Sequence, residues 1–333
     1  MLSNIIKKVL MLIPTFFGVT ILTFILVHSL PGDPVLAQLG DKAPSPEEYE
    51  AMKAALGLDQ SYLTQYLIYI KNIFHGDFGV SFNTGTPVLD EFFARFPATV
   101  ELGITAVLFA LILGLPIGIF AAINRGKWLD NLLMTISLVG YSMPVFWWGL
   151  ILVMVFSINL NWLPASGYFG VQYFIPQVTG FSLIDAIIAK DPAALKSAAM
   201  HIVLPTIALG TIPTAIIARM TRSSMLEILN EGFIQALKAR GVGPFRLIVG
   251  HALRNALIPI VTVLGIIVGG LVSGAILTET IFSWPGVGKW LVDAINSRDF
   301  PVIQSAILFI AIFVVLINLL VDVIYTLINP RAK

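Results

Sequence analysis

The sequence predicts an all-α, polytopic membrane protein with six transmembrane helices. Hydrophobic residues fill 57% of the 333 positions and charged residues only 12%, and the mean hydropathy is +0.89, so the chain is far more apolar than a soluble domain. A helix needs ~20 mostly apolar residues to cross ~30 Å of hydrocarbon, because each backbone amide must be bonded within it. Six stretches reach that length: 9–30, 100–123, 132–158, 201–218, 258–277 and 304–328.

The distribution of Lys and Arg predicts the orientation in the membrane. With a cytoplasmic N-terminus, segments 1–8, 124–131, 219–257 and 329–333 all lie in the cytoplasm, and they hold twelve basic against three acidic residues. Short cytoplasmic loops are enriched in Lys and Arg. We therefore expect both termini in the cytoplasm and an acidic extracytoplasmic side.

Segment 31–98 is expected to be an extracytoplasmic loop with helices of its own. Ser45-Pro46-Glu47-Glu48 is a capping box with proline at the first helical position, and Gly57 is a candidate helix end. A second helix is predicted by an apolar stripe at spacings of three and four. The stripe must lie on the membrane surface or on the transmembrane core, and it comprises Leu63, Tyr66, Leu67, Ile70, Ile73 and Phe74.

The two remaining outer segments, 159–200 and 279–301, are shorter. The first is rich in Gly and Pro and holds one apolar run, 183–189, that is too short to span a membrane. The second holds Trp284-Pro285-Gly286 and Trp290, which are residue types typical of a membrane interface and of a fixed turn.

Within the predicted spans, small residues predict close helix packing and one acid stands out. Asp322 is the only charged residue well inside a span, and a single acid without a chain of partners favours a structural hydrogen bond over a proton relay. Glycine pairs at four-residue spacing let helix backbones approach closely. The pairs are Gly114 with Gly118, Gly265 with Gly269, and Gly270 with Gly274.

The basic segment 219–257 is predicted to form helices in the cytoplasm. The turn Gly241-Val242-Gly243-Pro244 breaks the helical pattern. Before it, an apolar stripe either docks on another protein or folds back on the membrane domain, and the sequence leaves both alternatives open. The stripe comprises Leu226, Leu229, Phe233, Ala236 and Leu237.

Patterns for catalysis, nucleotides and metals are missing from the sequence. Gly286-Val287-Gly288-Lys289 is similar to the end of a phosphate-binding loop, but Ser283 and Trp290 stand where that loop needs Gly and Ser or Thr. The chain has no cysteine, and its four histidines lack the spacing of metal ligands. We expect no catalytic residue, cofactor or metal, and therefore no energy source in this chain.

One cytoplasmic motif carries a resemblance to a known family. QALKARG at 235–241 resembles the EAA loop of ABC importer permeases, in which a short helix ending at a glycine fits a groove on the ATPase subunit, and HALRNALIP at 251–259 resembles the return of that loop to the membrane. Gln235 and Leu237 replace the usual Glu and Ala. The resemblance implies an ATPase-coupling role for Gln235, Ala236, Leu237, Ala239, Arg240 and Gly241.

Further motifs extend the resemblance from end to end and narrow it to the peptide branch of the family. The chain is similar to B-type permeases of bacterial dipeptide importers. The motifs are PGDP at 31–34, GLD at 57–59, QY at 65–66, GDFGVS at 76–81, YSMPVFWWG at 141–149, RMTRSSM at 219–225 and ETIFSWPGVG at 279–288.

This resemblance implies the type I ABC importer permease fold over residues 1–333, in the bacterial cytoplasmic (inner) membrane. The implied function is ATP-driven import of dipeptides by a transport subunit that is not itself an enzyme, because partner chains bind the ATP. The implied partners are a homologous second permease, two ATPase subunits, an extracytoplasmic peptide-binding protein and membrane lipid, with no nucleic acid.

Alternative functions remain open at this point. The same architecture serves other cargo, namely oligopeptides, haem or nickel chelates, because specificity resides mostly in the binding protein. A membrane-embedded hydrolase would need a convergent catalytic set, and none is visible. A proton-coupled carrier would need inverted repeats and several intramembrane acids, of which only Asp322 is present.

Overall fold

A computed structural model describes residues 2–29, 32–39 and 45–328 of the chain. Within these ranges it consists of helices and turns, with one isolated antiparallel bridge between Val80 and Pro87. The all-α prediction is confirmed. The helices are α1 Leu2–Ser29, α2 Pro34–Leu39, α3 Pro46–Ala55, α4 Tyr62–Phe74, α5 Val88–Ile123, α6 Trp128–Ser142, α7 Val145–Leu152, α8 Ser182–Ile188, α9 Pro192–Leu229, α10 Gly232–Ala239, α11 Arg254–Ile281, α12 Val287–Ser297, α13 Phe300–Ile328, and the π-helices η1 Val153–Asn159 and η2 Arg246–Leu253.

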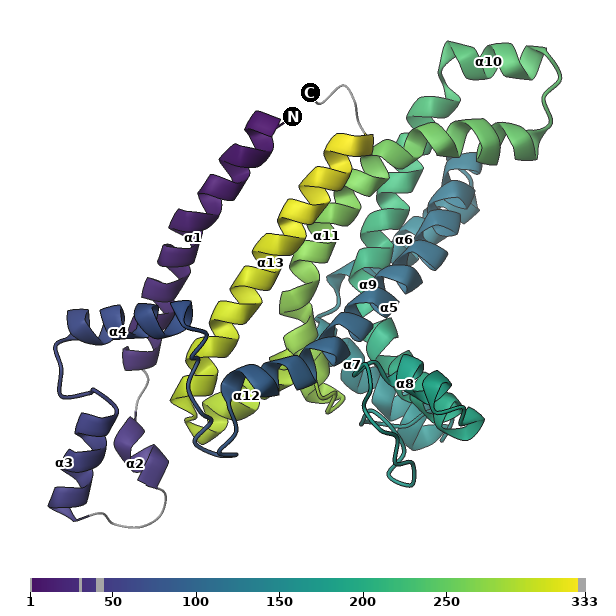
Figure 1. The fold of residues 1–333 in the computed structure, drawn as a ribbon. Helices are drawn as coiled ribbons and strands as arrows, with labels where there is room; N and C mark the ends of the chain where they lie inside the picture. Colours follow the sequence, from purple (N-terminus) through teal and green to yellow (C-terminus); the bar gives the residue numbers. More distant parts are fainter. Residues whose placement is uncertain (1, 30–31, 40–44, 329–333) are drawn as a thin grey trace.

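The long helices run between two ends of the molecule (Figure 1). One end carries the start of α1, the end of α13 and the protruding α10, and we call it the terminus end. The other carries α2, α3, α8 and α12, and we call it the loop end. The side chain of Asp322, on which the relay hypothesis rested, lies outside the described residues, as do Arg331 and Lys333.

Five helices of the described chain are long and apolar enough to cross a membrane, and a bent pair brings the number to six if it counts as one span. The bent pair corrects the third predicted span, 132–158, because α6 and the segment Val145–Asn159 meet at 105°. Met143 at the break is extended, with φ −79° and ψ 129°. The cause is Pro144, which has no N–H to donate and disfavours helical dihedrals in the residue before it.

Two other helices extend beyond the predicted spans. α9 runs unbroken for 38 residues, so it takes in positions 192–200, which the sequence assigned to an outer loop, and 219–229, which it assigned to separate cytoplasmic helices. Its first turn is fixed by Asp191, whose side chain accepts hydrogen bonds from the N–H groups of Ala193 and Ala194. α5 likewise begins at Val88, inside the segment predicted as the first outer loop.

α5 and α9 pack closely because glycines remove side chains from their interface. A Cβ atom at Gly118 would lie 2.5 Å from the carbonyl oxygen of Ala218, and one at Gly114 would lie 2.9 Å from that of Thr214. Both glycines are buried. The predicted role of the pair Gly114 and Gly118 is therefore confirmed, since any larger residue would force the two helices apart.

The other glycine pairs divide between a second interface and open space. Gly265 and Gly269 of α11 face Val321 and Asn318 of α13 with no room for a Cβ atom, which confirms that pair. A Cβ at Gly270 would meet nothing within 4 Å. The prediction that Gly270 lies in a close helix interface is therefore wrong.

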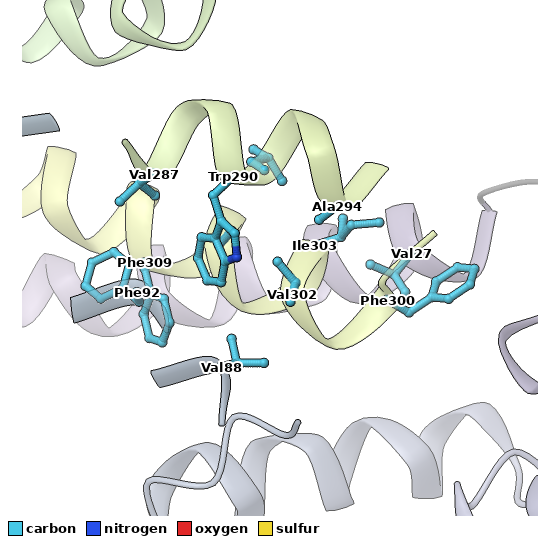
Figure 2. Close-up of a cluster of buried hydrophobic side chains, with 12 residues drawn as sticks. Val27, Val88, Phe92, Val287, Trp290, Ala294, Phe300, Val302, Ile303 and Phe309 are labelled. Carbon is cyan, nitrogen blue, oxygen red and sulfur yellow. The ribbon is translucent and has the colours of Figure 1, made fainter. Parts of the chain in front are cut away.

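At the loop end, α1, α5, α12 and α13 enclose a cluster of buried apolar side chains (Figure 2). Trp290 of α12 lies in it, between Val287 and Val302, with Phe92 and Phe309 beside it. Trp284 is also fully buried. Helices distant in the sequence therefore cover both tryptophans, whose residue type is typical of a membrane interface.

The segment between α1 and α5 folds much as its local signals predict. Ser45 and Glu48 form the reciprocal capping box, with Pro46 at the first helical position. Gly57 follows the last turn of α3 with φ +67°, the left-handed conformation that ends many helices. α4 then begins at an N-cap serine, Ser61, whose hydroxyl accepts from the Thr64 N–H.

Candidate coupling site

α10 is a two-turn helix held out from the terminus end of the bundle. After it the chain reverses at Gly241, where φ is +77° and the Gly241 N–H donates to the Lys238 carbonyl at 2.9 Å. Only glycine adopts this left-handed conformation without strain. The predicted helix ending at Gly241 is confirmed.

The inner face of α10 is anchored by one residue that the predicted stripe omitted. Ile234 is completely buried, in a cluster with Met225 of α9, Leu247 of η2 and Ala122 of α5. Leu237 is half-buried against the same cluster. α10 therefore packs on η2 and α9 through this cluster, which also includes a residue of α5.

The outer face of α10 is uncovered in the described chain. Phe233 is 43% exposed, and Ala236, Ala239 and Arg240 are also exposed. Gln235 is exposed as well, and its Nε2 donates to the Leu229 carbonyl at 3.4 Å. Leu226, Leu229 and Leu237 of the predicted stripe therefore fold back on the membrane domain. Phe233 and Ala236 face outward, so docking on another protein stays a prediction for them.

A π-helix, η2, connects this region to α11, and the sequence pattern did not predict it. Phe245, just before η2, is 79% exposed, and Val249 within it is also exposed. π-helices are rare and occur frequently at functional sites. We call these residues and Phe233, all of them exposed at the terminus end, the α10 surface.

Two arginines of the RMTRSSM motif fasten α9 to α6. Arg222 donates from Nε and Nη2 to the two carboxylate oxygens of Asp130, at 2.6 and 2.8 Å, and the Gly126 N–H donates to the same carboxylate at 3.0 Å. The Arg219 guanidinium lies 5.4 Å from the ring centroid of Tyr141. These basic residues of the predicted cytoplasmic side thus hold α9 against α6.

At the loop end, a buried carboxylate joins three helices. Glu279 of α11 is fully buried and accepts hydrogen bonds from Thr99 Oγ1 of α5 at 2.7 Å and from the Lys289 N–H of α12 at 3.0 Å. A Cβ atom at Gly288 would lie 2.6 Å from the Cα of Ile276. Glycine is required there because α12 packs directly on α11.

Glu101 of α5 is a second buried carboxylate, and it joins α5 to α8. Its buried carboxylate accepts hydrogen bonds from the Tyr168 hydroxyl at 2.8 Å, from both the N–H and the hydroxyl of Ser182 at 3.0 Å, and from the Leu183 N–H at 3.0 Å. A carboxylate at a helix N-terminus is favoured by the helix dipole. Sequence reasoning missed both glutamates, since an acid at the edge of a span looks like an ordinary loop residue.

Glu91 completes a set of three buried glutamates at the loop end. It accepts from Trp290 Nε1 at 2.6 Å and from Thr86 Oγ1 at 2.6 Å, and it pairs with Arg95 at 3.2 Å. Arg95 is the one basic side chain paired with any of the three in the described chain. These carboxylates therefore accept their hydrogen bonds mainly from hydroxyl and N–H groups.

The resemblance of 286–289 to a phosphate loop does not extend to its geometry. The N-terminus of α12, where a phosphate would bind, is occupied by the Glu279 carboxylate. Across the described residues, no group of three or more His, Asp or Glu side chains could hold a metal ion.

A cavity of about 570 Å³ lies at the loop end between α1, α3, α4 and the start of α13. Asp33 lines it and accepts hydrogen bonds from the Tyr49 hydroxyl at 2.7 Å and the Val35 N–H at 2.8 Å. Partial burial raises the pKa of Asp33, but these hydrogen bonds outweigh it, so the pKa lies below its ordinary value. The cavity wall is thus polar on this side, with Lys53 and Gln65 also lining it.

Comparison with known families covers nearly the whole chain. Residues 114–333 match the family described as the binding-protein-dependent transport system inner membrane component, and residues 1–103 match the N-terminal part of such membrane components. The chain belongs to this family. It is therefore a permease component of an inner membrane transport system, and the resemblance seen in its motifs is confirmed.

Curated relatives of this permease are similar over their full lengths. The di/tripeptide transport system permease DppB of Pseudomonas aeruginosa is 51% identical over 333 residues, covering 100% of this chain and 99% of the relative. The dipeptide permease DppB of Escherichia coli K12 is 48% identical over 336 residues, with the same coverage. The glutathione permease GsiC of Escherichia coli is 41% identical over 333 residues, again with the same coverage.

A solved structure confirms the fold of the permease. An inward-facing crystal structure of the MetNI methionine ABC transporter matches 70% of this chain and 93% of its own, with a TM-score of 0.51 at 18% identity. The ABC importer permease fold predicted from the sequence is therefore confirmed.

Proposed function

We propose that this chain is a permease subunit of an ATP-driven ABC importer that translocates dipeptides across the bacterial inner membrane. The observation that carries the proposal is the similarity to dipeptide permeases, which runs at 48–51% identity through all of the chain. The family membership and the importer fold support it.

The terminus end is the cytoplasmic end in this proposal. The excess of Lys and Arg there supports that orientation. The partners are two ATPase subunits at the α10 surface, a homologous second permease, and an extracytoplasmic peptide-binding protein at the loop end. This chain contributes no nucleotide site, cofactor or catalytic residue, in keeping with the α12 N-terminus being filled by Glu279.

The packing suggests how ATPase movement reaches the far side of the membrane. An ATPase that moves α10 displaces Ile234, which is buried in a cluster with residues of α5, α9 and η2. Those two helices are held together at Gly114 and Gly118, so they move as one body. At the loop end, Glu101 ties that body to α8, and Glu279 ties it to α11 and α12 through Thr99. Helices at both ends of the permease therefore move when α10 is displaced.

The experiment that tests the coupling role is Gly241→Val, with transport rate and ATPase co-purification measured together. A β-branched side chain at φ +77° costs ~1–2 kcal/mol locally and tilts α10. We expect normal abundance in the membrane and severely reduced transport. Gly232→Val is the matched control, because Gly232 lacks a positive φ and a Cβ there meets nothing within 4 Å.

A second variant tests contact with the ATPase. Ala236→Asp places a charge on the outer face of α10, where Ala236 is exposed in this chain, and we expect weaker recovery of the ATPase subunits. Full transport by both Gly241→Val and Ala236→Asp, or loss of either from the membrane, would exclude α10 as the coupling element.

The substrate is tested separately, because a 41% identical relative is named for glutathione. A deletion strain that requires one amino acid should grow on a dipeptide containing it only when this permease is restored. Rescue by longer peptides or glutathione, without rescue by dipeptides, would reject the dipeptide assignment while leaving the importer assignment intact.

A further inference from the structure

α4 has a mostly apolar face, which also carries the exposed Lys71, and no other part of the described chain covers it. Leu63, Leu67 and Phe74 are 69%, 58% and 69% exposed. They are four and seven residues apart, which places them on one side of a helix with 3.6 residues per turn. The predicted stripe is thus divided, because Tyr66 packs on α1 instead.

The opposite side of α4 carries two polar residues, Gln65 and Asn72, beside Tyr62, Ile68 and Tyr69. Gln65 and Asn72 are seven residues apart and lie about half a turn from Leu67. Both line the cavity of about 570 Å³, together with Asp33 and Lys53. α4 is therefore amphipathic, with its polar side toward α2 and α3 and its apolar side turned away from them.

Contacts with α1 place α4 beside the apolar stretch of that helix. The ring of Phe74 lies 5.9 Å from that of Phe16, and the Tyr66 hydroxyl lies 3.0 Å from Thr20 Oγ1. Gln65 Oε1 lies 2.9 Å from His28 Nε2. All of these α1 residues lie within 12–29, the part of α1 that is long and apolar enough to cross the membrane.

The apolar surface of α1 at this level is also uncovered. Phe17, Ile21 and Ile25 are exposed along the stretch that α4 contacts. Figure 1 shows α4 crossing the loop-end half of α1, with α2 and α3 beyond it. A helix with an apolar face at membrane depth and a polar face toward the loops has the arrangement of an interfacial helix.

We propose that α4 is an interfacial helix whose Leu63, Leu67 and Phe74 are immersed in the acyl chains of the lipid leaflet at the loop end. Its Gln65 and Asn72 face the aqueous side. The leaflet thereby holds α4 against α1 and supports the segment that encloses the large cavity. This proposal does not depend on which solute the importer carries.

The absence of cysteine from the chain gives a clean test. The assembled transporter is reconstituted in phospholipid vesicles with a nitroxide spin label on Leu67→Cys or, as the matched control, Asn72→Cys, with the identically treated cysteine-free permease as background. Collisions with oxygen, which partitions into lipid, are compared with collisions with a water-soluble nickel chelate. We expect oxygen to dominate severalfold at position 67 and the nickel chelate to dominate at position 72.

Two results would overturn the proposal. A label at position 67 that meets the nickel chelate as readily as one at position 72 would place α4 in water. A label at position 67 shielded from both reagents would show that another protein covers this face. Leu63→Cys, one turn away on the same exposed face, provides an independent repeat should Leu67→Cys assemble poorly.

Discussion

The two ends of the helical bundle differ in how their surfaces are completed. At the loop end, Glu91, Glu101 and Glu279 are buried, and donors within the chain satisfy their carboxylates. At the terminus end, Phe233 and Phe245 lie exposed on and beside α10. The loop end is therefore fastened by buried polar side chains of this chain, whereas the terminus end carries exposed phenylalanines on a protruding helix, where a partner can bind.

This difference follows from the cost of burying polar and apolar groups. A buried carboxylate is tolerated only when hydrogen bonds replace its water, so the loop-end helices must keep a fixed arrangement. An exposed phenylalanine imposes no such constraint within the chain. Substitutions at the loop end should therefore destabilise the permease itself, and substitutions on the α10 surface should impair assembly only.

The largest effect is expected from Glu279→Ala. It leaves Thr99 Oγ1 and the Lys289 N–H buried without their acceptor, at about 1–3 kcal/mol for each unsatisfied group. We expect a strongly lowered thermal unfolding temperature of the purified transporter and low abundance in the membrane. Glu279→Gln keeps the shape of the side chain and one acceptor oxygen, so its unfolding temperature should fall less. Equal stability of Glu279→Ala and the parent would show that the loop end does not depend on this network.

Gly118→Ala should come next, because its Cβ would lie 2.5 Å from the Ala218 carbonyl oxygen. Overpacking of this kind costs about 1–3 kcal/mol. Gly103→Ala is the matched control on the same helix, since a Cβ there meets nothing within 4 Å. Thermal unfolding of the two variants measures the difference, and an equal effect of both would argue against close packing of α5 on α9.

Phe245→Ser should change stability by less than about 0.5 kcal/mol, as exposed substitutions usually do, while lowering the amount of ATPase that co-purifies. Phe174→Ser is the comparison at the loop end, where Phe174 is almost fully exposed, and it should leave ATPase recovery unchanged. Were the two variants to lose ATPase equally, the contrast between the ends would fail.

The smallest effect is expected from reversing charges on the segment that precedes α5 and on the first turn of α5. Glu47, Glu50 and Asp90 are exposed and suit the test, whereas Asp33 and Glu48 make structural hydrogen bonds. Glu47→Lys with Asp90→Lys should weaken capture of the binding protein a few-fold at low salt and less at high salt, since charges are screened within ~10 Å at 0.1 M. A loss of binding-protein capture that is equal at low and high salt would point to misfolding.

Features that depend on neighbouring residues were predictable from the sequence. The apolar stretches, the capping box at Ser45 and the helix end at Gly241 are local, because a hydrogen bond or a φ angle within a few residues decides each of them. Pro144 was visible in the sequence, but the 105° angle between α6 and the segment Val145–Asn159 could not be derived from it.

Tertiary structure alone decided which side chains are buried. Ile234 and Phe233 are adjacent and both apolar, and only the cluster formed by α5, α9 and η2 selects Ile234 for the interior. Glu279 meets its donor Thr99 across 180 positions of sequence. The sequence determined the helices, their approximate spans and the family, since these depend on periodicity and short motifs. The partners of each side chain depend on helices that are distant in the chain, and no local pattern records them.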